Sequence, residues 1–74
     1  MEEFIKYFAV QFDETDASVF TNETEFHELE EWGSLTGLAI LNMIAKKYGV
    51  KVKPDELKNS RTISDVYSLI MEKK

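Results

Sequence analysis

Apolar residues recur at spacings of three and four along two long stretches of the chain, a pattern typical of amphipathic helices. The first stretch runs from Glu2 to about Asp13. Its predicted apolar face consists of Phe4, Ile5, Phe8 and Phe12. The second stretch leads from Ser34 to Gly49. Its predicted apolar face consists of Leu35, Leu38, Leu41, Ile44, Ala45 and Tyr48, widened by Ile40 and Met43.

The residues after Tyr48 carry the signals of two more helices. Gly49 is typical of the position just past a helix C-terminus. After a short extended segment, Pro54 opens a brief helical turn, because proline suits the first turn of a helix. Thr62 and Asp65 resemble a capping box at the start of a last helix. The apolar residues that this last helix would bury are Ile63, Val66, Leu69 and Ile70.

Residues 13–33 form a long polar and acidic loop between the first two helices. A loop of this length inside a compact domain is normally functional or held by its own apolar residues. The expected anchors are Val19, Phe20, Phe26, Leu29 and Trp32. No hairpin or strand-pair signal is present. The predicted fold class is therefore all-α: a small four-helix bundle, with three main helices plus one short helix and a long first loop, in a single domain over residues 1–74.

The composition narrows the kinds of protein that this chain can be. A chain of 74 residues buries only about 60% of the surface that it exposes when unfolded, which leaves little room for a deep catalytic cleft. There is no cysteine, so disulfides and thiolate metal sites are excluded. The amino terminus has no signal-peptide pattern, and the longest apolar run is too short to span a membrane. We expect a soluble, cytoplasmic monomer with no membrane partner.

Charge divides unevenly along the chain. Residues 1–33 contain ten acids and one base, whereas residues 34–74 contain four acids and eight bases. The acidic half would repel a nucleic-acid backbone, and the second half has no dense basic cluster, so nucleic acid is not an expected partner. The acidic half fits a docking face for basic partner proteins, but charge alone favours the simpler interpretation, which is ordinary solvation of a small domain.

Ser34 stands where the acidic loop gives way to the apolar helix. The plain interpretation is an N-cap, whose hydroxyl accepts a hydrogen bond from an unpaired amide and stabilises the helix by about 1 kcal/mol. The second interpretation is an attachment point for a phosphate, because a helix N-terminus offers free N–H groups and a positive dipole end. A lone serine favours the cap.

The residues around Ser34 resemble the acyl carrier protein family, which consists of small four-helix proteins. The family's attachment motif is Asp-Ser-Leu at the start of its second helix, eight residues after a loop phenylalanine. Phe26 and Ser34 have that spacing, and Leu35 completes the motif. Downstream, "KKYGVKVKPDEL" and "RTISDVYSLI" are similar to the family's helix end, linker, third helix and threonine-capped fourth helix. The resemblance covers almost the whole chain.

The resemblance implies that Ser34 carries a 4′-phosphopantetheine arm, transferred from coenzyme A by a phosphopantetheinyl transferase. The chain would catalyse nothing itself and would hold acyl groups as thioesters for separate acyl-transferring or acyl-activating enzymes, as in fatty acid or polyketide biosynthesis. Carriers of aminoacyl groups share the architecture, so aminoacyl cargo is an alternative. The other implied site residues are Leu35, Leu38 and Ile40 beside the arm, with Val52 and Leu57 across the acyl pocket.

The chain departs from the family pattern in two respects. Gly33 replaces the aspartate that helps the transferase recognise its substrate, and a glycine here is expected to loosen the turn into the helix. The second helix carries Lys46 and Lys47 instead of a row of acids, so partner docking is expected to use the loop or dedicated enzymes. Gly33 also supports a rival interpretation: an unmodified, degenerate carrier fold that serves as a protein-binding module.

Other candidate residues support no catalytic or metal site. His27 is the only histidine, and we expect it to be a solvated loop residue, because a metal site needs several converging ligands. Trp32 is expected to be a core plug. The acids at 28, 30 and 31 lie in an exposed loop with nothing to separate their pKa values. We therefore expect no enzyme activity.

Overall fold

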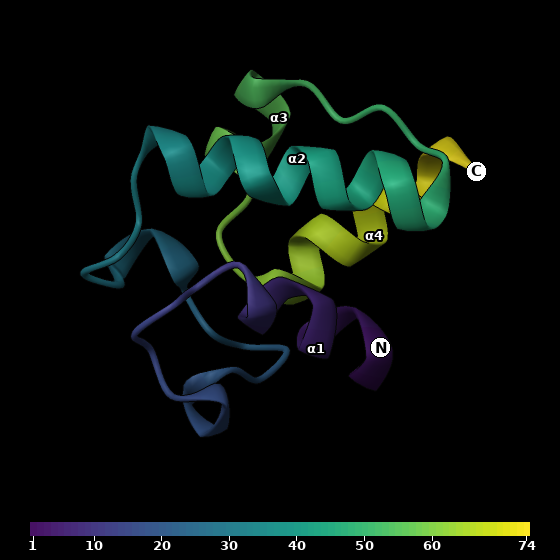
Figure 1. Ribbon diagram of the computed structural model, residues 1–74. Helices are drawn as coiled ribbons and strands as arrows, with labels where there is room; N and C mark the ends of the chain where they lie inside the picture. Colours follow the sequence, from purple (N-terminus) through teal and green to yellow (C-terminus); the bar gives the residue numbers. More distant parts are fainter.

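The computed structural model describes all 74 residues and contains helices but no strands (Figure 1). The four α-helices are α1 (Glu2–Val10), α2 (Ser34–Tyr48), α3 (Pro54–Asn59) and α4 (Ile63–Lys73). The first loop contains two single-turn 3₁₀ helices, η1 (Ala17–Val19) and η2 (Phe26–Glu28). The predicted all-α fold, with three longer helices, one short helix and a long first loop, is confirmed.

Five phenylalanines dominate the core, which consists of fourteen buried apolar residues. Three of these rings have no exposed surface, and they pack edge to face: the Phe4 and Phe8 ring centroids lie 5.9 Å apart, and those of Phe8 and Phe26 lie 5.1 Å apart. Phe26 comes from η2, so the first loop contributes directly to the core. The predicted anchor Phe20 is also buried, whereas Val19 is 45% exposed and does not anchor the loop.

The buried face of α2 agrees with the predicted one only in part. The predicted residues Ile40, Met43 and Ile44 are buried, whereas Leu35 and Leu38 are 83% and 53% exposed. The face turned to the core runs through Gly37, Ile40 and Ile44. These three positions have the spacing i, i+3, i+7 of a helical face. Glycine has no apolar side chain, so the hydrophobic pattern could not indicate that Gly37 lies on this face. The prediction assigned Leu35 and Leu38 to the face instead.

The predicted helix boundaries after α2 are confirmed. Gly49 adopts a left-handed backbone conformation with φ of 65°, which favours glycine, and its N–H donates to the Ala45 carbonyl at 3.1 Å. Pro54 is the first residue of α3. At the start of α4, the Asp65 N–H donates to the Thr62 hydroxyl at 3.2 Å, and the Thr62 N–H donates to the Asp65 carboxylate at 3.1 Å. The predicted capping box is therefore present.

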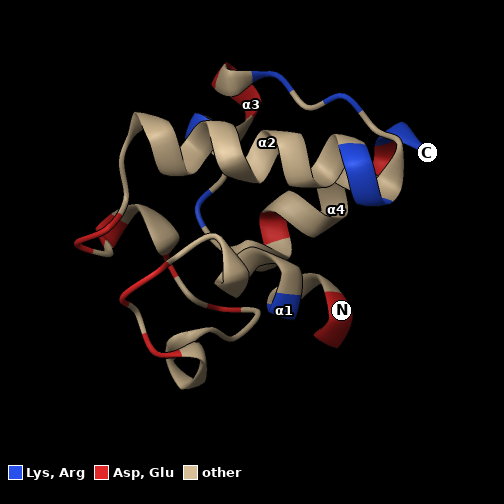
Figure 2. Ribbon diagram, viewed as in Figure 1, with Lys and Arg blue, Asp and Glu red and all other residues tan.

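Acidic and basic residues occupy different parts of the structure (Figure 2). Most of the acids lie along the first loop and at the start of α1. Of the eight bases of the second half, four lie at the C-terminal end of α2 and along the linker to α3, and the other four lie further along the chain, from Lys58 to Lys74. None of the helices combines the length and the apolar character that crossing a bilayer requires.

Candidate functional site

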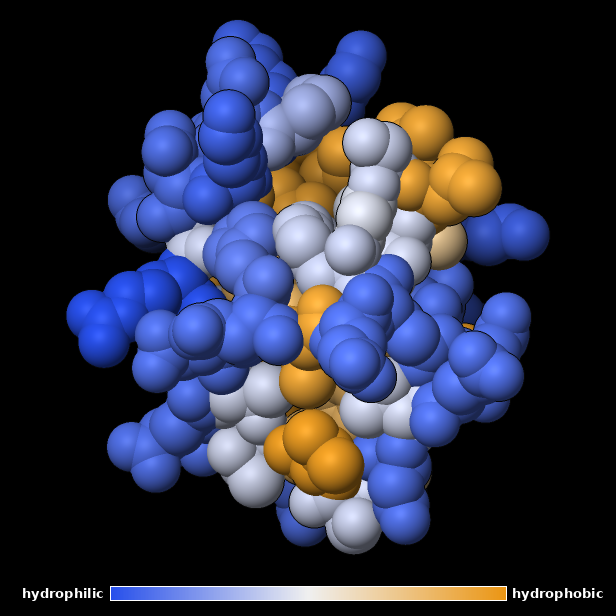
Figure 3. All heavy atoms as spheres, turned by 90° about the vertical axis from the view of Figure 1, so that its left-hand side faces the viewer, coloured by the Kyte–Doolittle hydropathy of each residue, from blue (hydrophilic) through white to orange (hydrophobic).

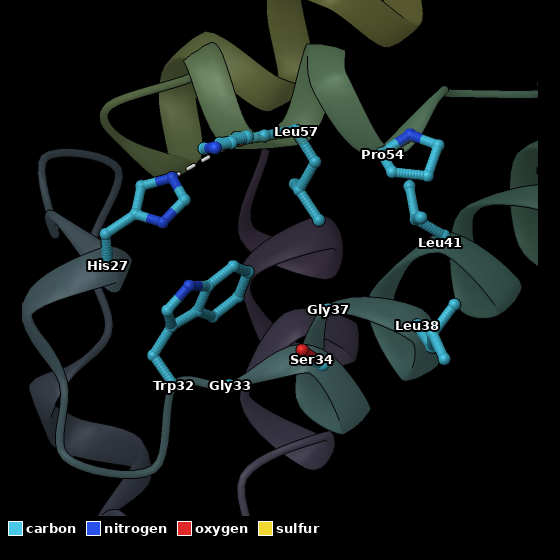
Figure 4. Close-up of a pocket in the computed structure, with 10 residues that line it drawn as sticks. His27, Trp32, Gly33, Ser34, Gly37, Leu38, Leu41, Pro54 and Leu57 are labelled. Carbon is cyan, nitrogen blue, oxygen red and sulfur yellow. Dashed lines mark hydrogen bonds between the residues drawn. The ribbon is translucent and has the colours of Figure 1, made fainter.

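A hollow of about 590 Å³ opens between the first loop, the start of α2 and α3 (Figure 4). Its ten lining residues are His27, Trp32, Gly33, Ser34, Gly37, Leu38, Leu41, Pro54, Leu57 and Lys58. The surrounding end of the molecule is largely polar, with apolar atoms gathered in separate patches (Figure 3). The hollow therefore brings the serine at the start of α2 together with residues from two other segments of the chain.

Trp32, Gly37 and Leu57 form the floor of the hollow. The side chains of Trp32 and Leu57 both point toward Gly37 (Figure 4). A Cβ atom built on Gly37 would lie 3.7 Å from the Trp32 ring and 3.8 Å from a Leu57 methyl group. The Trp32 ring also packs edge to face on the buried Phe26 ring, with centroids 5.0 Å apart. The expectation that Trp32 packs against the core is confirmed.

His27 joins the first loop to α3, and its predicted role as a solvated residue is wrong. The side chain is partly buried, and Nε2 lies 2.9 Å from the Ser60 carbonyl and 3.3 Å from the Leu57 carbonyl. The imidazole also contacts two aromatic rings, with centroid distances of 4.3 Å to Phe26 and 4.7 Å to Trp32. No local pattern could have indicated these contacts, because the carbonyls lie 30 and 33 residues further along the chain.

Ser34 is the first residue of α2 and not its N-cap. The cap position belongs to Gly33, whose carbonyl accepts the first helical hydrogen bond from Gly37 at 2.9 Å. The Ser34 side chain makes no capping hydrogen bond, so the predicted cap is wrong. As expected at a helix N-terminus, the N–H groups of residues 34–36 have no backbone acceptor. The serine therefore presents an exposed, uncommitted hydroxyl beside three free amides.

The backbone conformation at Gly33 does not require the conformational freedom of glycine. Its φ of −172° and ψ of −178° describe extended backbone that any residue adopts. A Cβ atom built at this position has no neighbour within 4 Å. A hydrogen bond from the first turn of α2 also stabilises this entry into the helix: the Thr36 hydroxyl donates to the Glu31 carbonyl at 2.8 Å. The turn therefore does not require glycine, and the expectation that Gly33 loosens it stays a prediction.

The predicted site residues fall into two groups. Gly33, Ser34, Leu38 and Leu57 all line the hollow. Three others do not: Leu35 points to solvent, whereas Ile40 and Val52 lie in the core with 0% and 5% of their surfaces exposed. The lining residues that the sequence did not indicate are His27, Gly37, Leu41, Pro54 and Lys58, together with Trp32, which was expected only in the core.

The charged side chain that lines the hollow is basic and exposed. Lys58 is the one lining side chain with a full charge at neutral pH, and no aspartate or glutamate lines the hollow. Lys58 belongs to neither of the two ion pairs in the structure. The N-terminal end of α2 adds the positive end of a helix dipole beside Ser34. Nowhere in the structure do three or more metal-ligating side chains cluster. The arrangement suits an anionic group attached at the helix start.

Comparison with protein families decides which kind of chain this is. The model of a family described as "phosphopantetheine attachment site" matches residues 3–70. The chain belongs to this carrier family. The match includes the whole hollow and all of α2 and α3. Comparisons with curated proteins and with solved structures gave no match.

Members of this carrier family hold 4′-phosphopantetheine covalently, so the chain is a phosphopantetheine carrier. Its residues fit the group. A free hydroxyl, unpaired amides and a lysine are suited to a phosphodiester, and the apolar floor is suited to the arm beyond it. When bound, the group supplies a terminal thiol that forms thioesters. The family is a carrier family and not a catalytic one.

Proposed function

We propose that Ser34 is the attachment residue and that the chain is a discrete acyl carrier protein, which holds acyl groups as thioesters for separate biosynthetic enzymes. The exposed Ser34 hydroxyl, which makes no capping hydrogen bond at the edge of the hollow, is the observation that carries this proposal. A hydroxyl engaged as a cap would use one of its two lone pairs for that hydrogen bond and be held in one orientation. This one is free in the resting fold.

Attachment would proceed by phosphoryl transfer from coenzyme A. The Ser34 oxygen attacks the phosphorus that bears the pantetheine, the bond in the diphosphate breaks, and adenosine 3′,5′-bisphosphate leaves. The hydroxyl proton passes to a base of the transferase, since no histidine or carboxylate hydrogen-bonds to Ser34. The contribution of the carrier is to present the hydroxyl on a rigid helix start, where free amides stabilise the new phosphodiester.

Lys58 favours acyl over aminoacyl cargo. An aminoacyl thioester carries a cationic amino group, which the lysine and the positive end of α2 would repel inside the hollow. An acyl group of the same length meets no such repulsion. Butyryl and 2-aminobutyryl arms differ only in that amino group, so they form a matched pair for a test. The butyryl form should have the higher unfolding temperature, and Lys58→Gln should narrow the difference.

The partners that we propose are a phosphopantetheinyl transferase and acyl-transferring or acyl-activating enzymes with basic docking faces. The acids at 28, 30 and 31 immediately precede the attachment helix, whereas α2 itself carries Lys46 and Lys47 at its far end. Attraction to a basic surface would therefore bring the partner to the Ser34 end of the molecule. Raising the salt concentration should slow loading if this attraction contributes.

Intact mass spectrometry tests the attachment directly. The protein is incubated with coenzyme A, Mg²⁺ and a broad-specificity transferase, beside Ser34→Ala and a matched control, Ser68→Ala, which changes an exposed serine on α4. We expect one phosphopantetheine on the parent and on Ser68→Ala, and none on Ser34→Ala. Modification of Ser34→Ala would show that another residue carries the arm.

The same mass-spectrometry experiment, run with Gly33→Asp, also tests whether Gly33 prevents modification. If the parent gained no mass but Gly33→Asp did, glycine at this position would be the obstacle to a general transferase. If neither chain were modified by any transferase tried, the rival interpretation of an unmodified protein-binding module would replace the carrier proposal.

A further inference from the structure

We infer that Trp32 closes the core to the cargo, so that this carrier holds short acyl groups on its surface and does not bury long ones. The inference rests on the proposed function, because it concerns the groups that a Ser34 arm would bring to the hollow. It assigns Trp32 a role in cargo specificity beyond packing.

The position of Trp32 supports this role. Its ring lines the hollow on one side and contacts the buried Phe26 ring on the other, with centroids 5.0 Å apart. The same ring fills the space over Gly37, where even a methyl group would be in van der Waals contact with it. Leu57 closes the far side of Gly37 and is itself 97% buried. The indole therefore lies between the hollow and the interior.

The interior behind this floor is filled. Ile40, Ile44 and Phe26 have no exposed surface, and none of them lines the hollow. Cores are packed as densely as organic crystals, so an acyl chain could enter only if side chains moved. With Trp32 in place, the tail of a long chain would find no apolar space below the floor.

The walls of the hollow limit what can bind above the floor. Most of the lining surface is apolar, but the hollow is partly open to solvent, and one of its leucines, Leu38, is 53% exposed. The remaining walls include His27, Ser34 and the charged Lys58. A short acyl group can lie on the indole and Leu57, whereas the later methylenes of a long chain would stay in water and contribute nothing to stability.

A single engineered thiol makes the test independent of any transferase. The chain has no cysteine, so Ser34→Cys carries one thiol at the attachment position. The probes are bromoacetamides with a spacer of pantetheine length and either a two-carbon or a ten-carbon terminal acyl chain. The thiolate sulfur displaces bromide and forms a thioether, and intact mass confirms the modification. The unfolding temperature of each product is then measured.

With Trp32 present, we expect the two products to unfold within about 2 °C of each other. In Trp32→Ala the ten-carbon product should be the more stable, by roughly 5 °C for each one or two methylenes that become buried. Trp32→Leu keeps an apolar side chain and should show the same trend if the alanine variant does not fold. Tyr7→Leu removes an aromatic ring of α1 that does not line the hollow, so it should behave like the parent.

A ten-carbon product more stable than the two-carbon product by more than about 2 °C in the Trp32-containing protein would overturn the inference. No gain with length in either Trp32 variant would also overturn it. Failure of the proposed function has a different signature, namely no phosphopantetheine on Ser34 in the transferase assay. Failure of the inference can therefore be distinguished from failure of the proposed function.

Discussion

His27 Nε2 lies 2.9 Å from the carbonyl oxygen of Ser60, and this contact ties the first loop to the end of α3. The same nitrogen lies 3.3 Å from the Leu57 carbonyl, so His27 makes both of these polar contacts between η2 and α3. His27→Leu keeps an apolar side chain but leaves the partly buried Ser60 carbonyl without the imidazole. We expect the free energy of unfolding to fall by about 1–2 kcal/mol, measured by urea denaturation. Glu28→Gln, at the exposed next position, should change it by no more than about 0.5 kcal/mol.

The same contact determines which ring nitrogen of His27 carries the proton in the neutral imidazole. Both neighbours of Nε2 are carbonyl oxygens, which only accept hydrogen bonds, so Nε2 must be the donor. We expect the neutral imidazole to be the Nε2–H tautomer. Long-range ¹H–¹⁵N correlation spectra of the ring report the tautomer directly. A neutral ring protonated at Nδ1 would contradict the contact with Ser60.

Ser34→Ala should have little effect on stability. The side chain makes no capping hydrogen bond and is exposed, so its removal leaves no polar group unpaired. We expect a change within about 0.5 kcal/mol in the free energy of unfolding, together with complete loss of phosphopantetheine loading. Thermal and urea unfolding, run beside the mass assay, check both parts. Destabilisation by 1 kcal/mol or more would indicate a cap that the structure does not contain.

Gly33→Asp should stabilise the protein. The backbone at this N-cap position is already extended and has free space for a side chain, so a carboxylate can accept a hydrogen bond from the first turn of α2. Its negative charge also lies at the positive end of the helix dipole. We expect a gain of about 0.5–1 kcal/mol in urea denaturation. Gly33→Ala is the matched control, and it should be destabilised because alanine is a poor N-cap. Equal stability of the two variants would refute the capping geometry.

Asp65 should make the free energy of unfolding depend on pH in the acid range. Hydrogen bonds from the backbone N–H groups of Thr62 and Arg61 hold the pKa of its carboxyl below the ordinary value of 3.8. Because the folded pKa is lower than the unfolded one, the carboxylate stabilises the fold above about pH 5. This contribution is lost as the pH falls through 3.8 and then through the lowered pKa.

Thermal unfolding of Asp65→Asn between pH 7 and pH 2 checks this dependence. The variant should be less stable than the parent at pH 7, and the difference should disappear at the acid end. Glu23→Gln changes an exposed loop acid whose side chain makes no hydrogen bond, so its curve should follow that of the parent. A constant gap between Asp65→Asn and the parent would contradict the prediction.

Local features of the sequence were enough to predict the helices. The apolar spacing, Gly49, Pro54 and the capping box between Thr62 and Asp65 each act over a few residues, and the structure contains all of these elements. The buried face of α2 was harder, because Gly37 contributes to it without an apolar side chain. Its burial depends on Trp32 and Leu57, which come from other segments.

The hollow depends on contacts that no local pattern encodes. Ser34 could be singled out from its position and its surroundings, but whether it or Gly33 is the cap depends on which carbonyl accepts the first helical hydrogen bond. His27 and Lys58 reach the same hollow from segments 31 residues apart. Only the packing of the first loop against α3 brings them together, so no sequence pattern could indicate that they share a site.

Trp32 is the single tryptophan of the chain, and it forms part of the floor on which the cargo would rest. The near-ultraviolet emission of the protein therefore comes mainly from one indole, at the place where binding would change its exposure to water. Loading and unloading could be followed in real time on unlabelled protein. The Trp32 ring, to which we assign the restriction on cargo length, would therefore also report cargo binding through its fluorescence.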